Sequence, residues 1–573
     1  MKPNPLAANA KETAATPAPE ERNISFIIGA SSVGTLIEWY DFYIFGMLAT
    51  IISKQFFPED SGTSALLSTL AIFAAGFIVR PFGALVFGRL GDLIGRKYTF
   101  LLTLVLMGGS TFLIGLVPSF NSIGWAAPIL VLVLRLVQGL ALGGEYGGAA
   151  TYVAEHAPAH RRGFWTSWIQ TTATLGLFLA LGVIILIRQS QGVERFSSEW
   201  GGWRYPFWIS LALVIVSILI RLKMSESPLF AKLKHSGKTS TNPLKESFGH
   251  KGNFKMVLLA LFGAVMGQGV IWYTGQFYAQ NFIETVCKID FIQSRNIILI
   301  AIALATPFFV VFGWLSDRVG RKWIMMLGML AGILAYFPIY KSFLANTNVA
   351  ARSGMVDIGK TTASTPLAIA DAKHPERLYL KRSFDTAYTD GSVFKYTKTD
   401  TITLAAPFVA ENNTVQIAMP GSSDTLTLPL KAPLDKTLKT GTTTVLAQTQ
   451  SAKPAVVVEK VMGSSVFWKF VFLVFIQIIF VTMVYGPIAA FLVEMFPTKI
   501  RYTSMSLPYH IGNGVFGGLV PFLATLIVEF TKGPDNPNGD PLAGLWYPIG
   551  VALVCLIIGT VYLRNTIDRD VMD

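Results

Sequence analysis

The chain has 573 residues, of which 52% are hydrophobic and 14% are charged, and it carries a net charge of +13. A soluble protein would carry about 25% charged residues, so this composition excludes an ordinary soluble globular protein. The apolar residues gather in runs of about 20 residues or more, each long enough to cross roughly 30 Å of hydrocarbon. The basic residues lie in the loops between these runs, which argues against a nucleic-acid-binding protein.

Residues 1–23 are rich in Ala, Pro and Lys and have no apolar core. We expect a disordered cytosolic tail there, without a cleavable signal peptide. The rest of the chain predicts an all-α membrane protein with twelve transmembrane helices. These are expected at 24–54, 64–88, 98–117, 126–153, 164–188, 205–222, 255–282, 294–314, 323–344, 465–494, 504–530 and 543–563.

Lysine and arginine are concentrated in alternate loops, which sets the expected orientation. The long loop at 223–254 alone contains six lysines, whereas the loops on the opposite side contain few basic residues. This bias predicts that both termini are cytosolic. A location integral to the cytoplasmic (inner) membrane is expected.

Two motifs recur along the chain. Gly88–Lys97, GRLGDLIGRK, returns at Gly313–Lys322 as GWLSDRVGRK, a shift of 225 residues. Glu155, Pro158 and Arg162 return 339 residues later as Glu494, Pro497 and Arg501. The difference, 339 − 225 = 114, measures an insertion in the second copy.

The repeat divides the chain into two six-helix halves, which is a known design for transporters. The expected domains are an N-terminal bundle at 24–222, a cytosolic linker at 223–254, a C-terminal bundle at 255–344 and 463–564, and an inserted domain at 345–462.

The insertion is Thr-rich and lies on the extracytoplasmic side by the predicted orientation. Alternating runs at 401–404, 414–418, 425–430 and 442–446, punctuated by Pro and Gly, predict a small β domain. A stable external cap, a substrate-capturing or partner-binding module, and disorder all remain open.

Ionisable side chains in the middle of a span are costly and usually functional. Glu38 and Asp41 share one face of the first predicted helix, three residues apart. Two carboxylates this close cannot both ionise freely in a low dielectric, so one is expected to hold a proton near neutral pH. We predict that they couple transport to protons. The alternative is a structural pair neutralised by Arg80 or Arg135.

Arg80 lies roughly 12 Å from the cytosolic end of the second helix, at 1.5 Å per residue. Its planar guanidinium needs an anion and fits a carboxylate in bidentate fashion; that anion could belong to a substrate or to the protein. In the fourth helix, Arg135 could complete a charge cluster with Asp41. Gln138 and Glu145 lie seven residues apart, nearly in line on one face.

The second half offers polar and aromatic side chains that suit one wall of a substrate cavity, although ordinary packing is an alternative for each. His510 could titrate near neutral pH or simply hydrogen-bond within the bundle. The predicted substrate-binding residues are Arg80, Arg135, Gln138, Gln268, Tyr273, Tyr485, Tyr509 and His510.

Charged residues at the cytosolic helix ends predict a conformational latch that pairs with arginines and helix termini in one access state. The predicted latch residues are Asp92, Arg96, Glu145, Asp317 and Arg321.

The repeated Gly–Asp–Gly–Arg–Lys loop resembles the signature of the major facilitator superfamily. Four further stretches resemble its metabolite:proton symporter family: EWYDFYIFG at 38–46, RPFGALVFG at 80–88, RLVQGLALGGEYGGA at 135–149 and FPTKIRYTSMSLPYHIG at 496–512. The resemblance covers about 24–564 except the insertion, which is atypical. It implies import of organic acids, shikimate or zwitterionic osmolytes, with Arg80 on the substrate carboxylate as in organic-acid members. The resemblance centres on the Trp–Tyr–Asp turn that contains Asp41.

Taken together, these patterns predict proton symport of a small carboxylate-bearing metabolite by alternating access. Alternatives are uptake of a zwitterionic osmolyte such as betaine or proline, an exporter or exchanger, and a transporter-like sensor. We find no P-loop, HExxH, GxSxG or Cys/His cluster, so no enzyme activity, cofactor or metal is expected. The expected partners are the substrate, a proton (with sodium open) and the lipid bilayer, with no nucleic acid and no ATPase subunit, and the protein is expected to be a monomer.

Overall fold

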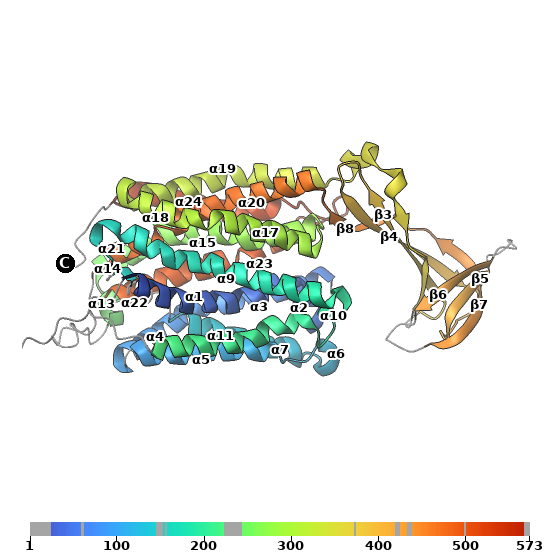
Figure 1. Cartoon of the computed structure of the whole chain (residues 1–573), viewed down its shortest axis with the longest axis horizontal. Helices are drawn as coiled ribbons and strands as arrows, with labels where there is room; N and C mark the ends of the chain where they lie inside the picture. Colours follow the sequence, from blue (N-terminus) through green and yellow to red (C-terminus); the bar gives the residue numbers. More distant parts are fainter. Residues whose placement is uncertain are drawn as a thin grey trace, which may run out of the picture.

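The computed structural model describes residues 24–58, 62–94, 96–144, 150, 153–154, 157–222, 243–371, 374–418, 425–431, 438–497 and 500–565. Two parts are visible in Figure 1: a bundle of long helices and a β-rich region that projects from one end of it. We call this end of the bundle the sheet end and the opposite end the far end. The predicted tail at 1–23 lies outside the described residues.

Apolar runs form the helices of the first half because a helix satisfies its own backbone polar groups in a lipid environment. The first run bends by 60° between Thr35–Met47 and Ala49–Phe56. The helices are α1 Ile24–Met47, α2 Ala49–Phe56, α3 Gly62–Ile78, α4 Arg80–Ile94, α5 Arg96–Ile114, α6 Phe120–Ile123, α7 Ala126–Leu142, α9 Arg162–Gln191, α10 Val193–Ser197 and α11 Tyr205–Leu222.

The second half is interrupted by π-helical segments, η4 Leu261–Val265, η5 Thr274–Tyr278, η6 Phe282–Val286 and η9 His510–Gly517. Such segments are frequent at functional sites. The α-helices are α13 Pro243–Gly249, α14 Lys251–Ala260, α15 Met266–Tyr273, α16 Ala279–Asn281, α17 Phe291–Ala305, α18 Pro307–Val319, α19 Arg321–Thr347, α20 Ser464–Tyr485, α21 Ile488–Met495, α22 Arg501–Tyr509, α23 Val520–Phe530 and α24 Trp546–Tyr562.

Within the described residues, nine helices are long and apolar enough to cross a membrane, or ten if the bent pair α1–α2 is one span. Two shorter apolar helices, Leu102–Ile114 and Ala126–Leu142, lie where the third and fourth spans are expected. The total of twelve spans therefore stays a prediction. Large apolar side chains cover the outside of the bundle, as lipid contact requires: Phe82, Ile129, Leu186, Leu334, Phe472 and Ile557 are all exposed.

Eight strands lie between α19 and α20. They are β1 Thr362–Ala363, β2 Leu367–Ala370, β3 Arg377–Ala387, β4 Val393–Leu404, β5 Asn412–Ala418, β6 Thr425–Lys431, β7 Lys439–Ser451 and β8 Val456–Val461. Their pairings run β3–β2–β6–β5–β7–β4 and return to β3, so six strands form a small closed barrel. Inward-facing side chains such as Leu380, Ile402, Ile417 and Leu428 fill it.

The β-rich region is hydrogen-bonded to the bundle through β8. The backbone N–H of Asp290 donates to the Lys460 carbonyl over 2.9 Å, and the N–H of Lys460 donates to the Lys288 carbonyl over 2.8 Å. The Gln293 amide bonds both backbone groups of Met462, at 2.8 and 2.7 Å. The strands are therefore attached to the loop between η6 and α17.

The four alternating runs predicted as strands all fall inside β4–β7. The predicted runs did not include β1, β2, β3 or β8; in β3, only Leu378, Leu380 and Ala387 are buried. The sequence reading also described 223–254 as a loop, whereas α13 and the start of α14 occupy the part that the structure describes. Residues 223–242 lie outside that part.

Candidate functional site

Asp41 lies in α1, in the middle of the bundle, with 0% of its surface exposed. Neither carboxylate oxygen has a hydrogen-bond partner among the described residues. No lysine or arginine of the described part forms an ion pair with it, so neutralisation by Arg80 or Arg135 is not observed. Ionising an isolated buried carboxylate costs free energy, which favours the protonated form. A proton carrier needs a group of this kind.

Glu38, the other predicted proton-coupling residue, lies one turn earlier in α1. Its side chain is outside the described part of the structure, so the predicted pair with Asp41 stays a prediction.

Arg80 begins α4, directly after the break between α3 and α4. Its guanidinium lies over two rings, 4.2 Å from the centroid of Phe77 and 4.8 Å from that of Phe42. Its Nε has no acceptor among the described residues, and no described carboxylate lies within ion-pair distance. This buried cation is held by aromatic faces, and the described part of the chain supplies no anion to its donors.

Arg135 approaches the same rings from α7, with its guanidinium 4.5 Å from the centroid of Phe45 and 5.0 Å from that of Phe73. Its Nη1 donates to Oε1 of Gln138, while Nε and Nη2 have no acceptor in the described part of the chain. Two buried guanidinium groups therefore share one aromatic cluster.

Gln138 uses its amide within the protein. Its Nε2 donates to Oγ1 of Thr111 over 2.9 Å and to the carbonyl of Asp41 over 3.3 Å, and its Oε1 accepts from Arg135. Gln138 thus orients Arg135 in this structure, and its predicted substrate contact stays a prediction.

The predicted residues of the second half come together opposite this cluster. The hydroxyls of Tyr485 and Tyr509 lie 2.9 Å apart, and Nδ2 of Asn513 donates to the Tyr509 hydroxyl over 3.0 Å. Gln268 and His510 are fully buried.

Several of these polar atoms have no partner among the described residues: both amide atoms of Gln268, both ring nitrogens of His510 and the hydroxyl of Tyr273. Buried polar groups nearly always have a partner, so their concentration here indicates that a polar ligand belongs at this place.

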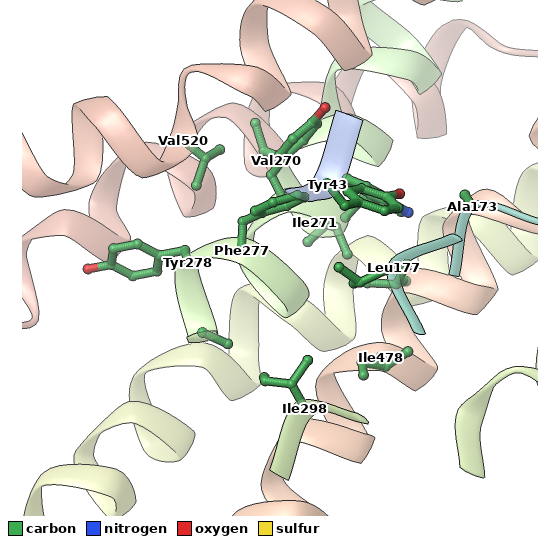
Figure 2. Packing of buried hydrophobic residues seen from close by; sticks show 14 of the residues in the cluster. Tyr43, Ala173, Leu177, Val270, Ile271, Phe277, Tyr278, Ile298, Ile478 and Val520 are labelled. Carbon is green, nitrogen blue, oxygen red and sulfur yellow. The ribbon is translucent and has the colours of Figure 1, made fainter. Parts of the chain in front are cut away.

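An aromatic layer joins the two halves beside the charged groups. Tyr43 of α1 stacks on Trp39 and Trp272, with centroid distances of 5.4 and 5.8 Å. Figure 2 shows Phe277 projecting next to Tyr43, and their centroids are 5.4 Å apart. Side chains of α1 and of the α15–η5 segment thus meet at the centre of the bundle.

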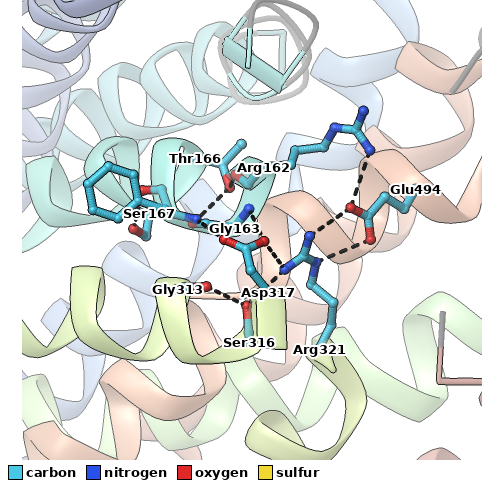
Figure 3. Close-up of polar contacts among 10 residues, drawn as sticks. Arg162, Gly163, Thr166, Ser167, Gly313, Ser316, Asp317, Arg321 and Glu494 are labelled. Atoms are coloured by element: carbon cyan, nitrogen blue, oxygen red, sulfur yellow. Dashed lines mark hydrogen bonds and ion pairs between the residues drawn. The ribbon is translucent and has the colours of Figure 1, made fainter. Parts of the chain in front are cut away.

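At the far end, a network of charged residues links the two halves (Figure 3). Arg321 donates to both oxygens of Glu494, at 2.8 and 3.1 Å, and to Asp317 over 2.6 Å. Arg162, from the first half, donates to the same Glu494 over 3.3 Å.

Asp317 also caps the first turn of α9. Its two oxygens accept the backbone N–H groups of Gly163 and Phe164, each over 2.8 Å. A Cβ on Gly163 would lie 2.5 Å from Arg321 Nη1 and 2.6 Å from the Gly313 carbonyl, so only glycine permits this approach. We call Arg162, Asp317, Arg321 and Glu494 the far-end latch.

The sequence prediction named Asp317 and Arg321 as latch members but not Glu494 or Arg162. The sequence does mark Glu494 and Arg162, because both belong to the repeated Glu–Pro–Arg motif. The side chains of Asp92 and Arg96, and all of Glu145, lie outside the described residues, so their predicted latch roles stay predictions.

A second inter-half network, which the sequence reading missed, lies at the sheet end. Glu284 of η6 accepts from Thr50 of α2 over 2.9 Å and from Arg295 of α17 over 2.9 Å. Arg295 also donates to the carbonyl of Met47 over 2.5 Å. We call Thr50, Glu284 and Arg295 the sheet-end latch, and with it both ends of the bundle are bridged between halves.

In the part of the chain that the structure describes, no three His, Cys, Asp or Glu side chains gather as metal ligands. Cys287 and Cys555 are buried and unlinked.

The known proteins to which this chain is similar are transporters. The family model described as "Sugar (and other) transporter" matches residues 27–241. The chain is 36% identical over 335 residues to the proline/betaine transporter of Salmonella typhimurium, covering 56% of this chain and 65% of that protein. It is 36% identical over 322 residues to the shikimate transporter of Escherichia coli, covering 55% of this chain and 72% of that one. The partially occluded inward-open xylose transporter XylE from E. coli shares the fold, with a TM-score of 0.58 at 14% identity, over 96% of this chain and 99% of XylE.

Proposed function

Because this chain belongs to the major facilitator superfamily of transporters, we propose that it imports a small carboxylate-bearing metabolite together with a proton, by alternating access. The observation that carries the proposal is the pair of buried guanidinium groups of Arg80 and Arg135, whose donors lack protein anions among the described residues. A substrate carboxylate supplies the anion that they need.

The substrate carboxylate would lie between these arginines and the polar wall formed by Gln268, Tyr273 and His510. Arg80 is the stronger candidate for direct contact, since Gln138 already occupies one edge of the Arg135 guanidinium. Rings on both sides keep water away from the ion pair, which strengthens it.

The proton would ride on Asp41. This carboxylate is buried without a donor or cation in the described part of the chain, so its charge state depends on what else occupies the site. Coupling requires that proton and substrate favour the same conformations, and the Gln138 amide links the backbone carbonyl of Asp41 to the guanidinium of Arg135.

The latches supply the two gates of alternating access. Contacts bridge the halves at both ends, and breaking one set would open the site to one side only. With the positive-inside bias, the far end faces the cytosol and the β-rich region faces outward. We further propose that the protein crosses the inner membrane twelve times, with the two shorter apolar helices Leu102–Ile114 and Ala126–Leu142 among the spans.

A zwitterionic osmolyte is the second candidate. The rings of Trp39, Tyr43 and Trp272 cluster beside Phe42, whose ring contacts both arginines. Aromatic faces attract cationic groups. The similarity to a proline/betaine transporter supports an osmolyte substrate as much as the similarity to a shikimate transporter supports an organic acid.

The test is uptake by purified protein in proteoliposomes, with shikimate, L-proline and glycine betaine as separate probes. We expect accumulation of at least one probe when the outside is acidic, and only equilibration when no pH gradient is imposed. Accumulation that follows a sodium gradient instead would contradict proton coupling, and accumulation of none of the three would contradict the proposed carboxylate substrate.

A further inference from the structure

A small pocket lies toward the sheet end, apart from the central site. Its lining comes from both halves: Thr50 and Phe73 from α2 and α3, and Phe277, Gln280 and Glu284 from the η5–η6 segment. Arg80 and Arg135 do not line it. The pocket therefore lies beside the sheet-end latch, and Thr50 and Glu284 belong to both.

Gln280 contributes to the pocket an amide oxygen that has no hydrogen-bond donor among the described residues. The residue is 4% exposed, and its Nε2 donates to Oε2 of Glu284 over 3.4 Å. Because a carboxylate only accepts, this bond fixes which end of the amide is oxygen. Its Oε1 then has no donor within the described part of the chain.

Glu284 does not compete for the same ligand group. Thr50 donates to one of its oxygens and Arg295 to the other, each over 2.9 Å. Its charge is thus neutralised in place. What the pocket lacks is a hydrogen-bond donor for Gln280, which a hydroxyl or a protonated amine supplies and a carboxylate does not.

Two rings separate the pocket from the central site. Phe73 and Phe277 line the pocket, with their centroids 5.4 Å apart. Phe277 also packs on Tyr43 and Tyr273 of the central layer, at 5.4 and 5.6 Å. It presses on the backbone of α1, since a Cβ on Gly46 would lie 2.5 Å from its ring.

We propose that this pocket is a second binding site, in which Gln280 accepts a hydrogen bond from a hydroxyl or protonated-amine group of the substrate before the substrate passes Phe73 and Phe277. The inference rests on the proposed function and narrows its substrate class. A hydroxy acid or an amino or imino acid carries both a carboxylate for the arginines and a hydrogen-bond donor for Gln280. A carboxylate whose other end is a trimethylammonium group has no N–H or O–H to offer.

The test compares Gln280→Met with Gln477→Met in proteoliposomes. Gln477 is a matched control, because it is fully buried on α20, its Oε1 also lacks a donor in the described structure, and it does not line the pocket. With shikimate and L-proline as probes, loss of one neutral hydrogen bond should raise KM about fivefold in Gln280→Met. The kcat should change little, and Gln477→Met should behave as the parent.

The outcomes separate this inference from the proposed function. Uptake of none of the probes by the parent would defeat both. Uptake of glycine betaine alone would leave carboxylate transport standing and overturn the second site, as would equal KM changes in the two glutamine variants. Should Gln280→Met aggregate, Ala49→Leu fills the same pocket and keeps Gln280: a raised KM supports the site, and an unchanged KM overturns it.

Discussion

Arg80 is the residue whose chemistry bears most directly on substrate binding. Its guanidinium is fixed between the faces of Phe42 and Phe77, which orients a planar fork toward the centre of the bundle. Lysine at this position keeps the charge but loses the fork and the stacking. We expect Arg80→Lys to fold and to lose transport by roughly tenfold or more.

The measurement is initial uptake by Arg80→Lys, normalised to monodisperse protein. Arg318→Lys serves as a control, since Arg318 is exposed at the far end and stacks on Trp314. Uptake by Arg80→Lys equal to that of the parent would remove Arg80 from the substrate site.

Asp41 is the residue on which coupling should depend. Asparagine has the shape of the protonated side chain but cannot release a proton, so Asp41→Asn should bind substrate and exchange it across the membrane. It should no longer accumulate substrate when the outside is acidic. Counterflow and pH-driven uptake measure these two activities separately, and Glu38→Gln should be milder or should damage binding itself. Full accumulation by Asp41→Asn would place the proton on another group.

How far the site could be predicted from sequence depends on the surroundings of each residue. Asp41, Arg80 and Arg135 could be found because a charge within an apolar run is rare. Glu284 and Arg295 could not, because they lie at the edges of predicted spans, where charges are ordinary. The role of Gln138 depends on its contacts with other helices, which no local pattern encodes.

At the scale of elements, the hydrophobic period predicted the long helices and the strands whose alternation is clean. It failed at β3, where only Leu378, Leu380 and Ala387 are buried and Lys381 and Arg382 follow the leucines directly. It also could not predict the π segments of the second half, since one extra residue in a turn leaves no mark in composition. The repeat offset predicted an insertion of 114 residues without reference to its fold, and the eight strands lie in the stretch that it indicated.

The attachment of β8 leads to a prediction about pH. Lys460 is buried beneath the β-rich region, and its Nζ donates to the Thr347 carbonyl over 2.6 Å. The pKa of Lys460 is lowered to about 8, chiefly by burial; Cys287 acts in the opposite direction, and the nearby Lys288 and Arg352 add to the lowering. The unfolded chain, with an ordinary lysine, thus binds more protons than the folded chain above pH 8.

Stability must therefore rise with pH where the unfolded state holds more protons. Below a pH of about 8 the buried amine is charged in the folded protein, and the cost of burying that charge lowers the free energy of unfolding in full. Between pH 8 and 10.5 the folded protein releases this proton and the cost disappears. We expect the melting temperature of the parent to rise relative to that of Lys460→Met as pH increases through this window. A difference between the two proteins that is independent of pH would contradict the prediction.

The far-end latch and the sheet-end latch connect the two halves of the bundle at its opposite ends. Glu494 joins Arg162 and Arg321 at the far end, and Glu284 joins Thr50 and Arg295 at the sheet end. Both are closed here, so the structure lies between the two open states that alternating access requires. Weakening one latch should then shift the population toward the state that is open at that end.

We expect Glu494→Gln to open the far end and Glu284→Gln to open the sheet end. Each change leaves buried arginines with a weaker acceptor, and a hydrogen bond to a charged group contributes about 1.5–3 kcal/mol, enough to shift the populations by roughly tenfold or more.

Single cysteines replace Ser167, buried beside the far-end latch, or Ala49, in the sheet-end pocket. Cys287 and Cys555 are changed to alanine in both backgrounds, and maleimide labelling rates report the opening. Glu494→Gln should speed labelling at 167 and slow it at 49, with the reverse for Glu284→Gln, because opening one end closes the other. If either variant speeds labelling at both positions, the glutamates hold the bundle together and do not select between its two open states.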